Sequence, residues 1–150
     1  MVREFAEFQG FTGKVEVTEQ SLREGLSLAE ADPGYARILL ARQPLPDKSS
    51  AIVGMALYFH NYSSWCGKPG IFLEDLYVRP HYRNHGYGKM LMQELAQEVL
   101  RIGGGRLDWT CLRRNQRSLE FYSSLGAEMR QDRVQFRLDG ESLQTLANSM

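Results

Sequence analysis

One short run, VRPHYRNHGYGK at positions 78–89, constrains the fold of this chain more than any other stretch. It joins the end of an apolar, strand-like segment to the start of a helical pattern, and it contains Arg83, Gly86 and Gly88 in the spacing R-x-x-G-x-G. Glycines allow a loop to turn its N–H groups inward, and the N-terminus of a helix adds partial positive charge. We therefore predict an anion site here, with full charges from Arg83 and Lys89.

Two common phosphate-binding loops differ from this run. No third glycine follows at the spacing of a dinucleotide loop, and the G-K-[ST] ending of a nucleotide-triphosphate loop is missing. A plain turn that binds nothing is the alternative interpretation. His81 and His85 lie four positions apart in the same run without a third ligand nearby in the pattern, so we expect loop histidines and no metal site.

The patterns on either side of the loop predict one mixed α/β domain. Leu91, Leu95 and Val99 recur at helical spacing within a helix expected over residues 88–102. Strands are expected at 35–41, 51–60 and 71–78 as an antiparallel meander, and at 107–112 and 134–138. Further helices are expected at the N-terminus and after the N-cap residues Thr18, Asn115 and Asp139. The helix after Asn115 is expected to end at residue 125, and the helix after Asp139 at residue 146. At roughly 100–200 residues per domain, residues 1–150 are expected to form a single domain.

Charge gives no overall case for a nucleic acid or membrane partner. Eighteen basic residues balance eighteen acidic ones, with a pI of about 6.8. Residues 1–75 contain 7 Lys and Arg against 10 Asp and Glu, and residues 76–150 contain 11 against 8. This asymmetry suits an anionic cofactor held by the second half of the chain.

The two cysteines, Cys66 and Cys111, are expected to be reduced thiols of a cytoplasmic protein. They lack C-x-x-C spacing, and a domain of this size has enough core to fold without a disulfide framework. The N-terminal residues are acidic and amphipathic, and no apolar run approaches 18 residues, so neither a signal peptide nor a membrane span is predicted.

A second motif adds to the loop. After LYV at 76–78 and the R-x-x-G-x-G loop, residues 115–127 read N-x-x-S-x-x-F-Y-x-x-x-G-A, and the combination resembles the GNAT family of acetyl-CoA-dependent N-acetyltransferases. Within the family, LEDLYV at 73–78 and WCGK at 65–68 are similar to the spermidine/spermine (diamine) acetyltransferase branch, which also includes enzymes for thialysine-like amines. The implied fold is the α/β acyl-CoA N-acyltransferase fold, a mostly antiparallel, splayed sheet flanked by helices.

The resemblance implies a binding site for acetyl-CoA and none for a metal. The strand around Tyr77 would pair with the pantetheine amides, residues 84–89 would cradle the pyrophosphate, and Asn115 and Ser118 would contact the cofactor from the following helix. The cofactor-binding residues assigned in this way are Leu76, Tyr77, Val78, Arg83, Asn84, His85, Gly86, Tyr87, Gly88, Lys89, Asn115, Ser118 and Tyr122.

The same resemblance implies two catalytic residues. Tyr122 would protonate the departing thiolate, and its alternative is a tyrosine whose hydroxyl bonds to the backbone. Glu74 would bind the substrate ammonium and receive its proton through water, and its alternative is a salt bridge on a sheet face. Successive strand residues point to opposite faces, so we expect only one of Glu74 and Asp75 to face a given pocket. The substrate-binding residues are Glu74, Asp75, Asp108, Trp109 and Thr110.

The sequence departs from the family pattern at its start. Met1 already falls inside the expected first helix, so the first strand is expected to be missing, and an exposed sheet edge favours a homodimer. Substrate contacts from the end of that helix would fall on Phe8 and Gln9. The predicted activity is acetyl transfer to a primary amine, first a diamine or polyamine; the alternatives are a thialysine- or lysine-like amine, or a catalytically silent acyl-CoA-binding module.

Overall fold

The computed structural model describes residues 1–11, 13, 15–26 and 34–149. The chain forms two compact units, Met1–Leu112 and Arg113–Met150. No helix in the described part combines the length and the apolar character that crossing a membrane requires.

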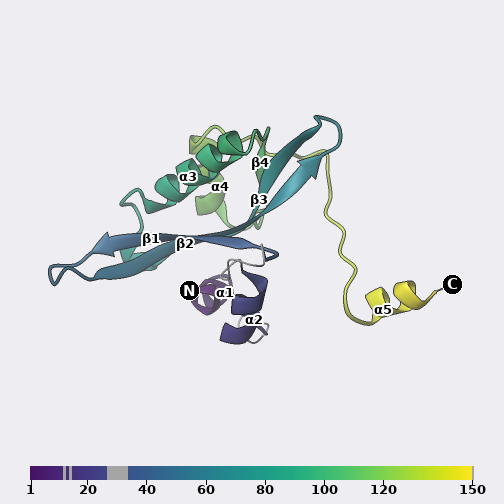
Figure 1. Cartoon of the computed structure of the whole chain (residues 1–150), viewed down its shortest axis with the longest axis horizontal. Helices are drawn as coiled ribbons and strands as arrows, with labels where there is room; N and C mark the ends of the chain where they lie inside the picture. The colour runs from purple at the N-terminus through teal and green to yellow at the C-terminus, as the bar shows by residue number, and fades with distance from the viewer. Residues whose placement is uncertain (12, 14, 27–33, 150) are drawn as a thin grey trace. The chain divides into compact units, whose positions relative to one another are not determined.

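A four-stranded sheet forms the centre of the first unit (Figure 1). Its strands are β1 Arg37–Pro44, β2 Ser50–Ser63, β3 Lys68–Val78 and β4 Leu107–Trp109, in the order β1-β2-β3-β4. The first three pair antiparallel, and β4 runs parallel to β3. The predicted meander and the mixed α/β class are therefore confirmed.

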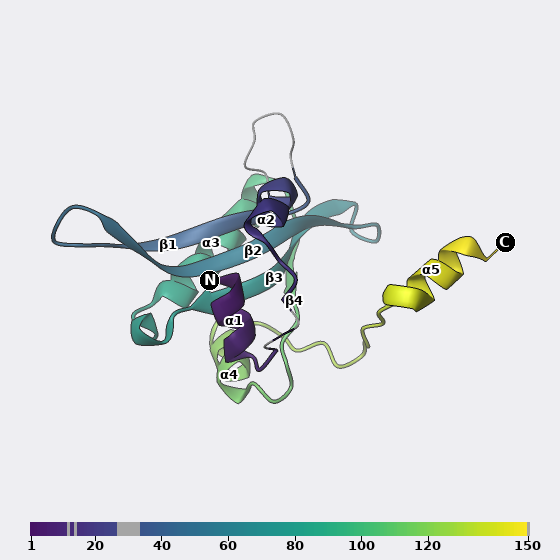
Figure 2. The ribbon, with the colours of Figure 1, turned by 90° about the horizontal axis from the view of Figure 1, so that it is seen from below.

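Helices cover both faces of this sheet. The helices α1 (Val2–Phe8) and α2 (Glu19–Gly25) lie on one face, and α3 (Tyr87–Arg101) lies on the other (Figures 1 and 2). The apolar stripe of α3 is buried against the strands, as the periodicity predicted, through Leu91, Met92, Leu95 and Val99. A glycine with a φ of 68°, Gly103, follows the end of this helix, in the left-handed conformation that glycine adopts most readily.

The predicted N-caps are confirmed as the residues before their helices. Thr18 accepts a hydrogen bond from the Ser21 N–H and forms a capping box at the start of α2. In the second unit, Asn115 accepts from the Ser118 N–H at 3.3 Å before α4 (Gln116–Ser124). Asp139 precedes α5 (Gly140–Asn148) without a side-chain capping bond.

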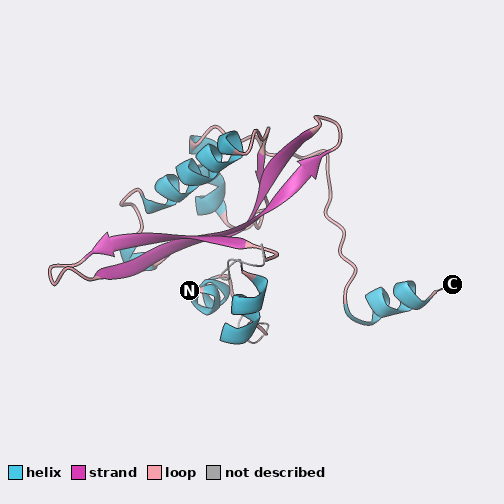
Figure 3. Ribbon diagram, in the orientation of Figure 1, coloured by secondary structure: helices cyan, strands magenta, loops and turns pink. Residues whose placement is uncertain are grey.

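Two strand predictions need correction (Figure 3). The predicted strand at 107–112 ends at Trp109. Residues 134–138 form no strand, although their alternating pattern favours one, and Val134 and Phe136 are 76% and 89% exposed. A strand needs a neighbour for its backbone hydrogen bonds, and none of the described strands pairs with this segment.

Candidate active site

Strand β3 contains one extra residue, Glu74. Along β2 and β3, Tyr58 lies opposite Leu73, and the next pair is Leu57 opposite Asp75. Glu74 has no opposing residue on β2, which is the arrangement of a β-bulge. Because directly opposed residues share a face and consecutive residues do not, Leu73 and Asp75 lie on opposite faces of the sheet.

The bulge interrupts the regular alternation of faces between Leu73 and Asp75. Beyond the bulge, Asp75 shares a face with Tyr77, whose ring packs on Phe5 of α1 with 5.5 Å between centroids. Asp75 thus points to the face that α1 and α2 cover and is partly buried, whereas Glu74 is exposed. The Glu74 carboxylate is near enough to disfavour the charged form of Asp75.

Asp75 carries the most perturbed carboxyl group of the site. Burial, and in second place the negative charge of Glu74, raise the pKa of Asp75 to about 6. A carboxyl group of this kind is mostly ionised at neutral pH and can still hold a proton, which is what a general base requires. The pair can therefore attract a cation and take up a proton.

Beyond the bulge, no described strand pairs with the edge of β3 that faces β4. The described pairing of β3 with β4 covers only residues 71–73 of β3. The Arg79 N–H donates to the Val53 carbonyl of β2 at 2.9 Å, so the Val78 carbonyl, in the same trans peptide, points away from β2. The backbone groups of Leu76 point the same way, two positions along the strand. An extended ligand can pair with this edge.

Tyr77 differs from its two neighbours on this edge. Its backbone groups point toward β2, because their direction alternates along a strand. Its ring is 5% exposed and lies under α1, where burial raises the pKa of its phenol. Among Leu76, Tyr77 and Val78, the backbone groups of Leu76 and Val78 therefore point away from β2, and the Val78 carbonyl accepts a hydrogen bond from Arg83 Nε.

The loop after β3 has the geometry of an anion site. The chain passes through a short turn of 3-10 helix, η1 (Pro80–Tyr82), and then takes positive φ values at Asn84 (65°) and Gly86 (84°). Gly86 is the N-cap of α3, whose first turn contains no acidic residue. The first N–H groups of a helix have no intrahelical partner and attract anions. Lys89 is exposed in this first turn.

Arg83 is held between this loop, the edge of β3 and α1. Its Nε donates to the Val78 carbonyl at 2.9 Å, and its Cζ lies 4.1 Å from the centre of the Phe8 ring and 5.8 Å from that of Tyr77. The Nδ1 of His85 lies 2.8 Å from the Arg83 carbonyl oxygen, which tightens the loop behind it. The guanidinium thus contacts protein groups at the point where the sequence predicted a charge for the anion.

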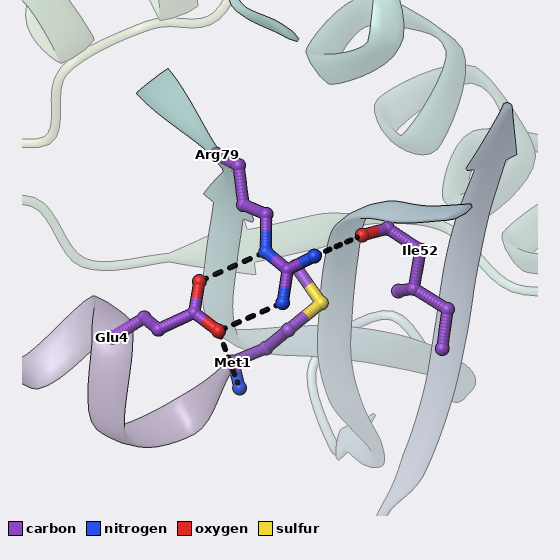
Figure 4. Close-up of polar contacts among 4 residues, drawn as sticks. All are labelled: Met1, Glu4, Ile52 and Arg79. Carbon is purple, nitrogen blue, oxygen red and sulfur yellow. Dashed lines mark hydrogen bonds and ion pairs between the residues drawn. The ribbon is translucent and has the colours of Figure 1, made fainter. Parts of the chain in front are cut away.

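A second arginine fixes the start of α1 to the sheet (Figure 4). Arg79 donates from Nε and Nη2 to the two carboxylate oxygens of Glu4, at 2.9 and 2.8 Å, and from Nη1 to the Ile52 carbonyl at 2.8 Å. The Met1 ammonium lies 3.5 Å from Glu4. The bonds from Arg79 hold the pKa of Glu4 below its usual value.

Asp108 is part of a polar bridge across three strands. The Nδ2 of Asn61 lies 3.5 Å from the Asp108 carboxylate, and Arg106 Nε forms an ion pair with it at 2.8 Å without hydrogen-bond alignment. A Cβ added to Gly70 on the strand between them would come within 2.5 Å of the Asn61 side-chain oxygen. The glycine therefore lets Asn61 reach β4.

The predicted substrate-binding residues of β4 divide between the two faces. Asp108 pairs with Phe72, which neighbours Leu73 and so shares the face of Asp75. Trp109 pairs with Leu73 and lies on the face of α3. Thr110 follows the end of the strand and is exposed.

The second unit carries the remaining predicted residues on one helix. Asn115 caps α4, and Ser118, whose N–H it accepts, lies in the first turn. Tyr122 is half-buried on the same helix, and its ring lies 5.3 Å from that of Phe121.

Two features of this site were not found from the sequence. The bulge at Glu74 depends on the register with β2, for which the run IFLEDLYV has no local marker. The bidentate pair of Glu4 and Arg79 joins residues 75 positions apart. The bulge could have been found only after the pairing of β3 with β2 was known, because the alternation of backbone directions along β3 is then seen to break at Glu74.

Comparison with known sequences gives the same family for most of the chain. The sequence model described as the acetyltransferase (GNAT) family matches residues 7–127. A thialysine N-epsilon-acetyltransferase of Bos taurus is 34% identical over 98% of this chain and 88% of its own length. An L-ornithine N5-acetyltransferase of Arabidopsis thaliana is 36% identical over 68% of this chain and 46% of its own length.

Solved structures agree with the fold. An integron cassette protein from the mobile metagenome of V. cholerae, VCH_CASS6, superposes with a TM-score of 0.77 at 27% identity, over 98% of this chain and 87% of that protein. The expected mixed α/β acyltransferase fold is confirmed by these likenesses. Family, fold and curated acetyltransferase relatives agree: the chain is an acetyltransferase and belongs to the GNAT family.

Proposed function

We propose that this enzyme transfers acetyl from acetyl-CoA to a primary aliphatic amine, which attacks directly. The observation that carries the proposal is the bulge at Glu74, which places two carboxylates, one with a pKa near 6, beside the open edge of β3. An aliphatic amine with a pKa of about 10 is protonated at neutral pH and must lose a proton before it attacks. The carboxylate pair can attract the substrate ammonium and can accept the proton that the ammonium must lose.

Acetyl-CoA supplies the activated acetyl group in this family. Three features fit such a ligand: the backbone of Leu76 and the N–H of Val78, which point away from β2, the two left-handed residues of the loop, and the N-terminus of α3 with Lys89. The proposal assigns the amide-bearing arm to the strand edge and the pyrophosphate to residues 84–89. Asn115 and Ser118 are assigned to the cofactor from the second unit.

The two carboxylates have separate tasks. Glu74 is exposed and meets the incoming ammonium, and the proton then passes through water to the pair. Asp75 lies deeper, and its raised pKa suits it to hold that proton at neutral pH. Tyr122 Oη is assigned the return of a proton to the leaving thiolate, a role supported by its position in the motif N-x-x-S-x-x-F-Y.

The first candidate acceptor is a diamine or polyamine, in keeping with the relative described as spermidine/spermine N(1)-acetyltransferase-like protein 1 of Homo sapiens. A thialysine-like amino acid is the second candidate. One observation favours it: Asp108, which was expected to bind the substrate and could attract a second ammonium of a polycation, already forms an ion pair with Arg106. An acceptor that places a single ammonium group at the Glu74–Asp75 pair needs no further carboxylate to bind a second ammonium group.

We also propose that the enzyme is a cytoplasmic homodimer. The two cysteines are free thiols, which is typical of a reducing compartment. The exposed apolar side chains of Val134 and Phe136 support association of copies. Sedimentation analysis of the full chain at several concentrations tests the dimer, and a monomer at all of them contradicts it.

The activity is tested by following thiol release from acetyl-CoA with spermidine, spermine, putrescine, thialysine, ornithine, lysine and a lysine peptide. Calorimetry with CoA runs alongside. We expect turnover with a preferred amine, strongly reduced by Glu74→Gln and unchanged by Glu16→Gln, an exposed carboxylate outside the site. CoA binding without turnover on any amine would instead favour a silent module, and absence of CoA binding would contradict the assignment of the loop.

A further inference from the structure

We propose that Arg83 is a positioning residue that couples the open edge of β3 to the C-terminal end of α1. Binding of CoA at that edge then stabilises the part of α1 that borders the amine site. This inference rests on the proposed function, because it takes the edge to be the CoA site.

The first half of the coupling is the bond between Arg83 and the strand edge. Arg83 Nε donates to the Val78 carbonyl at 2.9 Å, and that carbonyl points away from β2 toward the open side. A ligand that pairs with Leu76 and Val78 fixes this carbonyl, and with it the guanidinium. A hydrogen bond from a charged donor is among the stronger ones in proteins.

The second half is the stacking of the same guanidinium on α1. Arg83 Cζ lies 4.1 Å above the ring of Phe8, the last residue of the helix, and Phe8 also packs on Tyr77 with 6.2 Å between ring centres. Tyr77 shares its face with Asp75. The end of α1 is therefore a near neighbour of the carboxylate that is assigned to the amine.

The two ends of α1 are held differently. Arg79 fixes the first turn through Glu4, and this bond does not involve the open edge. Phe8 is 50% exposed, and its ring contacts Arg83 and Tyr77. A helix of seven residues has little stability of its own, so the contacts of Phe8 with Arg83 and Tyr77 help to order its last turn.

Amide hydrogen exchange of the α1 peptide, with and without saturating CoA, tests the coupling without any acceptor. We expect CoA to slow exchange of residues 5–11 by about threefold in the wild-type protein and in Arg42→Met, which removes an exposed arginine on β1. In Arg83→Met and in Phe8→Leu we expect this protection to disappear while calorimetry still detects CoA binding. Protection that persists in both variants would overturn the proposal.

Kinetics give a second readout on the preferred amine. Loss of the stacked guanidinium is expected to raise the KM for the amine about tenfold with a smaller change in kcat, and Arg83→Lys should recover part of the loss. The double variant Arg83→Met/Phe8→Leu should be no worse than either single one, because both break one contact. Independent, multiplying effects would contradict the coupling.

The two hypotheses fail in different ways. Wild-type protein that binds no CoA overturns the proposed function and the coupling together. CoA binding without any protection of α1 overturns the coupling alone. An increase confined to the Kd for CoA in Arg83→Met would make Arg83 a direct anion ligand, which also overturns it.

Discussion

Leu73 and Asp75 are two positions apart on β3 and yet lie on opposite faces of the sheet, because Glu74 between them is an extra residue. In a regular strand, position 75 would share the face of Leu73, which is 2% exposed under α3. The bulge instead turns the carboxyl group of Asp75 to the face of α1. A partly buried carboxylate thus lies on the face of the sheet that α1 and α2 cover.

Asp75→Asn is expected to stabilise the protein at pH 7. Its folded-state pKa, near 6, lies above the usual 3.8, so the folded state binds the extra proton between these values and loses stability as pH rises through them. Removing the charge should add about 1–2 kcal/mol at pH 7, after allowance for partial exposure, and nothing below about pH 4. Denaturant titrations from pH 4 to 8 measure this; equal stability of variant and wild type across the range would contradict the burial of the charge.

The same substitution should change the pH dependence of catalysis. If Asp75 takes up the amine's proton, the acid limb of kcat/KM in the wild-type enzyme falls with an apparent pKa of about 6, the value for Asp75. Asp75→Asn should lower kcat and remove this limb. If the acid limb of kcat/KM were unchanged in Asp75→Asn and lost in Glu74→Gln, Glu74 would be the residue that accepts the proton.

Tyr122→Phe is expected to lower kcat by about 100-fold, in the range of a lost general acid, with CoA affinity nearly unchanged. The hydroxyl is removed while the ring keeps its contact with Phe121. Steady-state kinetics and calorimetry measure the two effects, and Tyr62→Phe, at an exposed tyrosine on β2, is the matched control. Full activity of Tyr122→Phe would show that the Tyr122 hydroxyl is not the general acid.

Glu4→Gln should weaken the attachment of α1. The bonds from Arg79 lower the pKa of Glu4, so their contribution is present above the usual value of 4.5 and is lost as pH falls through the lowered one. Because both side chains are more than a third exposed, we expect at most about 1 kcal/mol at pH 7. Thermal unfolding at pH 7 and pH 3 measures the difference, with Glu7→Gln on the same helix as control; an equal loss at both pH values would contradict the ion pair.

Gly70→Ala is expected to destabilise the sheet by about 1–3 kcal/mol. A Cβ there would lie 2.5 Å from the Asn61 oxygen and 3.0 Å from the Arg106 carbonyl, which belongs to the backbone and has little room to move. Gly105→Ala is the control, since its Cβ would meet Lys68 no nearer than 3.5 Å. Similar unfolding midpoints for the two variants would show that Asn61 can leave its place at no cost.

Local patterns in the sequence were sufficient to predict the main helices and the three-stranded meander. Thr18 and Asn115 begin their helices through their own side chains, and the apolar stripe of α3 is buried as its spacing indicates. The loop before α3 could also be predicted, because Gly86 in the left-handed conformation is a local requirement. Each of these depends on residues within a few positions of one another.

The details of the site depend on partners far along the chain. The role of Glu74 as an extra residue follows from its pairing with β2, and the position of Arg83 follows from Phe8 on α1. The alternation at 134–138 satisfied the local pattern of a strand, but a strand also needs an edge to pair with. Local chemistry predicts which residues can form an element, and pairing decides which of them do.

Because Glu74 is an extra residue in β3, its carboxylate can be removed without changing how the other residues of β3 pair with β2. If the codon for Glu74 were deleted, Leu73 would still face Tyr58 and Asp75 would still face Leu57, now as consecutive residues of a regular strand. One in-frame gain or loss of three nucleotides at this position can therefore add or remove an acidic group without moving any other strand pair. A sheet built in this way can change its chemistry in a single genetic step while its core stays in register.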